Sequence, residues 1–211
     1  VPLMCASLLQ LLFNAVDIIV VGNYVGDEAM AAVGSNTALI NLLTNFFMGL
    51  SIGANVLVAR YFGAKQSKDV KETTHTAMKL SIYSGLILTV VGIIFAKELL
   101  VWMNTPKEVL ELATVYLRIY FVGMTATMVY NFGSAVLRAF GDTKRPLVYL
   151  ALAGVINVVL NLIFVIVFDM GVAGVAIAKV ISQTVSAVLI FMCMIKEKND
   201  MHIEIKKLKV N

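Results

Sequence analysis

"INVVLNLIFVIVFDMGVAGVAIAKVISQ", residues Ile156–Gln183, decides the fold, because two long apolar runs are joined there by a short turn. The turn, DMGVAG, contains the Gly and Asp residues that commonly end helices. A bilayer core of ~30 Å is crossed by about 20 helical residues at a rise of 1.5 Å each. The stretch therefore predicts two neighbouring membrane-spanning helices.

The rest of the chain repeats this pattern. Hydrophobic residues make up 60% of it and charged residues only 14%, whereas soluble domains are nearer half apolar and a quarter charged. The mean hydropathy is +0.89. We predict an all-α membrane protein, a bundle of six transmembrane helices within residues 1–195, followed by a basic tail, residues 196–211. The predicted spans are Leu3–Val21, Ala31–Tyr61, Ala77–Ala96, Ala113–Phe140, Leu147–Phe168 and Val172–Ile195.

The basic residues predict the orientation, because Lys and Arg collect in short cytoplasmic loops. Most of the 17 flank the second loop, the fourth loop or the tail, whereas Lys97, Lys107 and Arg118 fall on the other side. We therefore expect a multi-pass protein of the cell membrane with both ends of the chain in the cytoplasm. This topology accounts for the net charge of +4, so no nucleic acid partner is expected. No catalytic motif or cofactor loop is recognisable, so we expect neither an enzyme nor a bound cofactor.

Polar side chains inside the spans are the candidate functional residues, because burying them in lipid is costly. The first span carries three at i, i+4 and i+7, which share one helix face: Gln10, Asn14 and Asp17. An i, i+4 pair, Asn157 and Asn161, lies on the fifth span, and Lys179 lies on the sixth. Counted from the turns, Asp17 lies about 8 Å deep and both Asn161 and Lys179 about 12 Å deep. We therefore predict a single buried site.

Gln10 and four further residues are candidates for lining a cavity. Asn41 and Asn45 lie on the second span, and Tyr130 and Asn131 lie on the fourth. Intramembrane amides also tie helices together by hydrogen bonds, and this alternative stays open for them.

Three segments resemble the amino-terminal half of a multidrug and toxic compound extrusion (MATE) transporter. They are VDIIVVGNYVGDEAMAAVG at Val16–Gly34, VLRAFGDTKRPL at Val136–Leu147, and the stretch quoted first. The resemblance implies one lobe of a two-lobe, pseudo-symmetric transporter that alternates access to a central cavity. It implies export of small organic compounds, often cationic, in exchange for Na⁺ or H⁺.

The resemblance also implies roles for individual residues. Asp17 matches the acidic cation-coupling residue of the family, and Asn157 and Asn161 match its polar partners, so these three would hold Na⁺ if Na⁺ is the coupling ion. Asn14 and Lys179 are predicted to complete the group. The basic tail would lead to a second six-helix lobe that this chain lacks. Two alternatives are a lipid-linked oligosaccharide flippase of the same superfamily and a membrane scaffold that transports nothing.

The chain departs from the family at two positions. Thr125 stands where proline is usual, which predicts a straighter fourth helix. Lys179 stands where threonine is usual. Three alternatives follow for its ammonium: an ion pair with Asp17 that replaces a mobile cation, a group that itself carries a proton, or a side chain that extends outward to the headgroups.

Overall fold

The computed structural model describes residues 2–197 and 202–203, with side chains from residue 8 onward except residue 10. This part of the chain is helical and contains no strand. Its elements are α1 (Pro2–Tyr24), α2 (Asp27–Gly63), α3 (Ser67–Trp102), α4 (Lys107–Val122), α5 (Met124–Ala139), α6 (Lys144–Leu162), the π-helical turn η1 (Ile163–Val167) and α7 (Gly171–Lys196).

The predicted spans are confirmed as helices of one bundle. Within the described residues, α2, α3, α6 with η1, and α7 are long and apolar enough to cross a membrane, and the bent pair α4 and α5 forms a fifth such span. The described apolar segment of α1 is shorter, Leu11–Tyr24. The whole of α1 has 23 residues, however, which at 1.5 Å each is about 35 Å.

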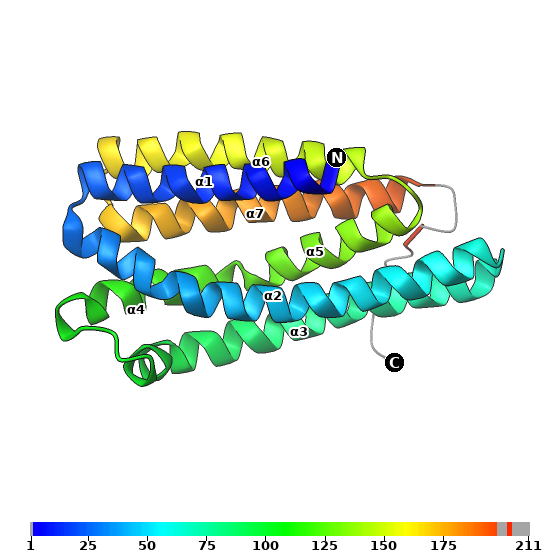
Figure 1. The fold of residues 1–211 in the computed structure, drawn as a ribbon, viewed down its shortest axis with the longest axis horizontal. Helices are drawn as coiled ribbons and strands as arrows, with labels where there is room; N and C mark the ends of the chain where they lie inside the picture. Colours follow the sequence, from blue (N-terminus) through cyan, green and yellow to red (C-terminus); the bar gives the residue numbers. More distant parts are fainter. Residues whose placement is uncertain (1, 198–201, 204–211) are drawn as a thin grey trace.

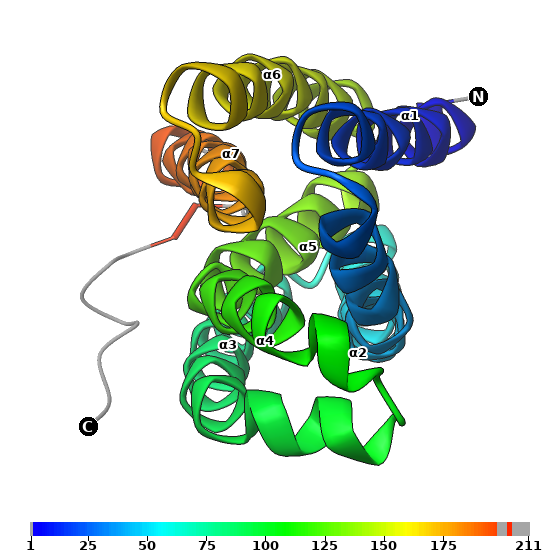
Figure 2. The same cartoon turned by 90° about the vertical axis from the view of Figure 1, so that its left-hand side faces the viewer.

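The helices run along one common axis and form two groups (Figures 1 and 2). One group contains α1, α6 and α7, which pack side by side, and the other contains α2, α3, α4 and α5. The α1–α2, α3–α4 and α6–α7 connections all lie at one end, on the left in Figure 1. The α2–α3 and α5–α6 connections lie at the opposite end, as expected for helices that repeatedly cross one layer.

Turn residues set the ends of the helices. Gly26 has a φ of 114° directly before α2, a conformation that glycine adopts without steric cost. At the start of α6, the Asp142 carboxylate accepts hydrogen bonds from the backbone N–H groups of Lys144 and Arg145, at 3.2 and 3.1 Å. These bonds satisfy two donors that have no partner inside the helix.

The fourth span is bent by 48° between α4 and α5, so the prediction of a straighter helix was wrong. Proline is not needed, because the bend lies at Gly123, which packs closely against Val180 of α7. The Thr89 hydroxyl of α3 donates a 2.8 Å hydrogen bond to the Phe121 carbonyl in the turn before the bend. A side chain that inserts into the helical hydrogen-bond ladder is a known cause of kinks.

The chain turns back onto the bundle after α7. Ile203 is buried among apolar side chains of α2, α3, α5 and α7, including Val58, Met78 and Phe132. Its backbone N–H donates to the Met194 carbonyl at 3.4 Å. Ile203 therefore belongs to the packed end of the bundle, although it follows the predicted boundary at residue 195.

Large apolar side chains cover the outside of the bundle. Leu42, Phe46, Ile87 and Val155 are all more than half exposed. Of an apolar 18-residue segment of α2, only 11% is buried inside the protein. Apolar surface on this scale is stable against lipid tails or another protein surface rather than against water.

Candidate functional site

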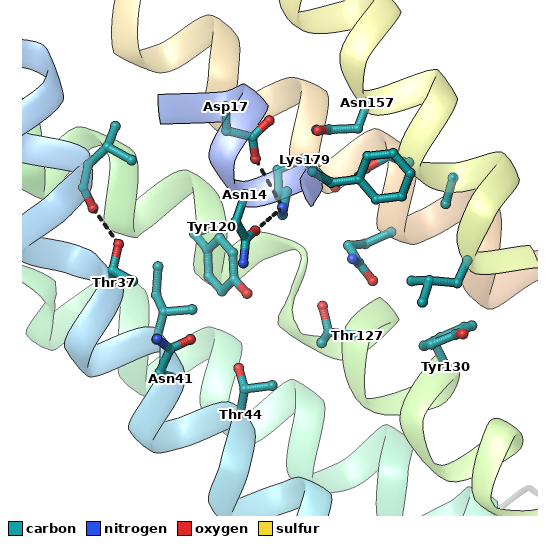
Figure 3. A pocket seen from close by; sticks show the side chains of 18 of the residues that line it. Asn14, Asp17, Thr37, Asn41, Thr44, Tyr120, Thr127, Tyr130, Asn157 and Lys179 are labelled. Atoms are coloured by element: carbon teal, nitrogen blue, oxygen red, sulfur yellow. Dashed lines mark hydrogen bonds and ion pairs between the residues drawn. The ribbon is translucent and has the colours of Figure 1, made fainter. Parts of the chain in front are cut away.

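The candidate site is centred on a buried ion pair between α1 and α7 (Figure 3). The Lys179 Nζ atom lies 3.0 Å from Oδ2 of Asp17, and their side chains are only 15% and 5% exposed. The same ammonium donates to Oδ1 of Asn14 at 2.9 Å, one turn before Asp17 on α1. The structure therefore contains the ion pair of the first alternative for Lys179, whose ammonium contacts Asp17 and Asn14.

The other carboxylate oxygen of Asp17 is held by α6. Asn161 Nδ2 donates to Oδ1 of Asp17, and it also lies 3.5 Å from Oδ1 of Asn157. Asn157 and Asn161 are nearly completely buried, at 2% and 0% exposure. Their remaining amide atoms, Asn157 Nδ2 and Asn161 Oδ1, have no hydrogen-bond partner within the described chain. Buried polar atoms usually have partners, so these two are open to a ligand or water.

The pair faces a cavity of about 120 Å³ between the two helix groups. Sites that enclose drug-sized ligands measure about 300–1,000 Å³, so this lobe alone does not enclose such a molecule. The polar lining residues include Asn14, Asp17, Thr37, Asn41, Thr44, Tyr116, Tyr120, Thr127, Tyr130, Asn131, Asn157, Lys179, Ser182 and Gln183.

The structure brings most of the predicted site residues to this cavity. Its lining includes Asn14, Asp17, Asn157 and Lys179. Asn161 is not a lining residue, but it donates a hydrogen bond to Asp17. The predicted lining residues Asn41, Tyr130 and Asn131 also face it.

One predicted lining residue lies away from the cavity, and the side chain of another is not described. Asn45 is exposed on α2 and is not among the lining residues. The side chain of Gln10 lies outside the described residues.

Thr37 and Thr44, which flank Asn41 on α2, also line the cavity and were not predicted from the sequence. Their spacing, i, i+4 and i+7, puts all three residues on one helix face, and this signal could have identified them. Asn45 shares the i, i+4 relation with Asn41, but Figure 3 shows Thr44 on the cavity side. An amide spacing alone therefore does not select the correct face.

Two other asparagines on α2 serve packing. Asn36 is fully buried, and its Nδ2 atom donates to the Ala113 carbonyl of α4 at 3.0 Å. Asn55 donates in the same way to the Ala135 carbonyl of α5. These bonds to backbone carbonyls connect α2 to α4 and α5, which is the structural alternative for intramembrane amides.

A buried carboxylate such as that of Asp17 requires a positively charged partner or a proton. In this structure the partner is an ammonium group of the protein itself. The fold and the site thus define a multi-pass helical membrane protein with a polar interior cavity and a buried charged pair.

The chain belongs to the MatE family, because the family model of that description matches residues 2–163. It is 31% identical over 197 residues to "Probable multidrug resistance protein YpnP" of Bacillus subtilis, which covers 93% of this chain and 44% of that protein. It is 29% identical over 192 residues to "Probable multidrug resistance protein NorM" of Thermotoga maritima, covering 88% of this chain and 41% of that protein. The chain thus spans less than half the length of these curated relatives.

Solved structures share the fold. A crystal structure of MATE in the bent conformation superposes with a TM-score of 0.90 at 27% identity, covering 100% of this chain and 47% of that one. A MOP superfamily transporter from Pyrococcus furiosus also superposes with a TM-score of 0.90 at 27% identity, covering 100% of this chain and 46% of that one. For that protein, a reversed polarity of the binding pocket has been taken to suggest a different function.

Proposed function

We propose that this chain is the amino-terminal lobe of a secondary active transporter that exports small organic compounds in exchange for Na⁺ or H⁺. The observation that carries the proposal is the buried Asp17 carboxylate, which lies at the wall of a polar cavity in a bundle of spanning helices. The names of the relatives, multidrug resistance proteins, support organic compounds as the substrates.

The proposal includes a second lobe, because the cavity of this chain is smaller than a site that encloses a drug-sized molecule. A matching six-helix lobe would complete the cavity, and rocking of one lobe against the other would expose it alternately to each side. The aromatic and amide side chains of the lining, among them Tyr120 and Asn41, would contact the substrate.

The proposed orientation places the α2–α3 and α5–α6 connections in the cytoplasm of a cell-membrane protein. It is supported by the basic residues near those connections, such as Arg60, Lys65 and Lys144, because Lys and Arg collect on the cytoplasmic side. The cavity residues near the α1–α2 turn then lie in the outer half of the membrane.

Transport by the natural protein that contains this chain, reconstituted in proteoliposomes, tests the proposal. We expect an imposed Na⁺ or H⁺ gradient to drive a fluorescent organic cation across the membrane. The Asp17→Asn variant should abolish gradient-driven flux, because an amide neither binds a proton nor balances a cation. Glu108→Gln, at an exposed acid in the first turn of α4, is the matched control and should transport normally.

Two results would contradict the antiporter. Gradient-driven flux that is equal in the wild type and in Asp17→Asn would separate coupling from this carboxylate. A complete absence of gradient-driven flux, in protein shown to be folded, would instead favour the membrane scaffold or the flippase.

A further inference from the structure

The ammonium of Lys179 takes up the oxygen atoms that a bound cation would need. It contacts Oδ2 of Asp17 at 3.0 Å and Oδ1 of Asn14 at 2.9 Å. The remaining Asp17 oxygen already accepts a hydrogen bond from Asn161. Hard metal cations bind through several oxygen ligands at once. Among the amide and carboxylate oxygens of these side chains, Asn161 Oδ1 alone is buried with no partner.

The charge balance also disfavours a metal cation at Asp17. Among the lining residues of the cavity, Asp17 and Lys179 are the charged ones, and they compensate each other. A Na⁺ ion at Asp17 would bring a second positive charge next to an ammonium that is only 15% exposed. Like charges in so dry a site repel strongly, because little water screens them.

We propose that Lys179 is a built-in counter-cation that excludes Na⁺ from Asp17, so its ammonium determines the cation specificity of the site. Na⁺ binds there only after Lys179 is removed from the carboxylate. The inference deepens the proposed function and rests on it for one consequence, namely that a Na⁺ gradient does not drive export through Asp17.

Melting temperatures of the purified natural protein test this without any transport. Each variant is melted in NaCl and in choline chloride at equal ionic strength, and the difference between the two salts reports bound Na⁺. The wild type should show no difference. Lys179→Thr, which replaces the ammonium by a neutral oxygen ligand, should melt at a higher temperature in NaCl, with Na⁺ affinity at least about tenfold above wild type, equivalent to ~1.4 kcal/mol.

Two further variants show whether the effect comes from the charge and from this site. Lys179→Arg keeps a cation at the position and should behave like the wild type. The double variant Asp17→Asn with Lys179→Thr should lose the Na⁺-dependent shift, because the carboxylate is gone. If Lys179→Thr does not fold, Lys179→Gln takes its place with the same expected shift.

A Na⁺-dependent shift in the wild type that disappears in Asp17→Asn would overturn the inference, as would the lack of a shift in both neutral variants of Lys179. Neither outcome bears on whether the protein exports organic compounds, which the proteoliposome assay measures separately. A failed export assay with the expected melting results would reject the transport proposal and leave the cation specificity in place.

Discussion

Among the described residues, two of the charged clusters lie toward opposite ends of the bundle. Near the α1–α2 turn, Lys179 pairs with Asp17 at 3.0 Å, and the side chains are 15% and 5% exposed. Near the α5–α6 connection, Arg145 pairs with Asp142 at 2.6 Å and also with Glu197. The Arg145 side chain is 45% exposed, which is three times the value for Lys179.

The difference in burial gives the two clusters different energetics. Two unit charges 4 Å apart attract by about 1 kcal/mol in water and about 4 kcal/mol at an effective dielectric constant of 20. Water and salt reach the half-exposed Arg145 guanidinium and can partly replace it for Asp142 and Glu197, whose side chains are 19% and 18% exposed. Neither can do so readily at Asp17, so the buried pair should behave as a unit whose halves are costly to separate.

The largest expected effect is that of Lys179→Met, which leaves the Asp17 carboxylate buried without its cation. In Na⁺-free buffer this variant should lower the free energy of unfolding by about 3–5 kcal/mol, the usual result of removing one partner of a buried pair. Denaturation of the purified protein measures the loss.

The double variant Lys179→Met with Asp17→Asn is the control for that loss. It should recover most of the stability, because no uncompensated charge remains. A double variant that is as unstable as the sum of the two single variants would show that the pair is not coupled, and the comparison between the two clusters would fail.

A smaller effect is expected from Asn161→Leu, which removes the hydrogen bond to Asp17 Oδ1 but keeps the ion pair. Leaving a buried acceptor without its donor should lower the free energy of unfolding by about 1–3 kcal/mol. Asn36→Leu, which breaks a buried bond to the Ala113 carbonyl, is the matched control. Both variants should lose stability, and adding Lys179→Met should show a coupling energy with Asn161→Leu but not with Asn36→Leu.

The smallest effect is expected from Arg145→Gln at the exposed cluster. The loss should be about 0.2–1 kcal/mol, and raising the salt concentration should reduce the difference from wild type. Melting curves at low and high salt measure both values. A loss as large as that of Lys179→Met, insensitive to salt, would mean that burial does not distinguish the clusters.

Much of the site could be predicted from the sequence, because helical spacing and turn positions determine which residues share a face and a depth. Asp17, Asn161 and Lys179 were expected at similar depths, and the structure brings them into contact. The position of the Lys179 ammonium could not be predicted, because a lysine side chain is long enough to reach either the carboxylate or the headgroups. Only the positions of α1 and α7 relative to each other decide it.

The shape of the fourth span could not be predicted, because its cause lies on other helices. The bend at Gly123 depends on Val180 of α7 and on the Thr89 hydroxyl of α3. The sequence of the span itself contains Gly123 at the bend and Thr125 two residues later, and neither residue by itself predicts a bend of this size. The expectation that a helix without proline is straighter therefore failed here, because contacts between helices determine the path of the backbone.

The burial of Ile203 has a consequence for where the folding unit ends. Its side chain fills a space between α2, α3, α5 and α7, seven residues after Lys196, the last residue of α7. A protein shortened to residue 195 would open that space to water and expose the neighbouring Met78 and Phe132. Residues after the last helix thus contribute to the core, and a stable isolated lobe should include them through residue 203.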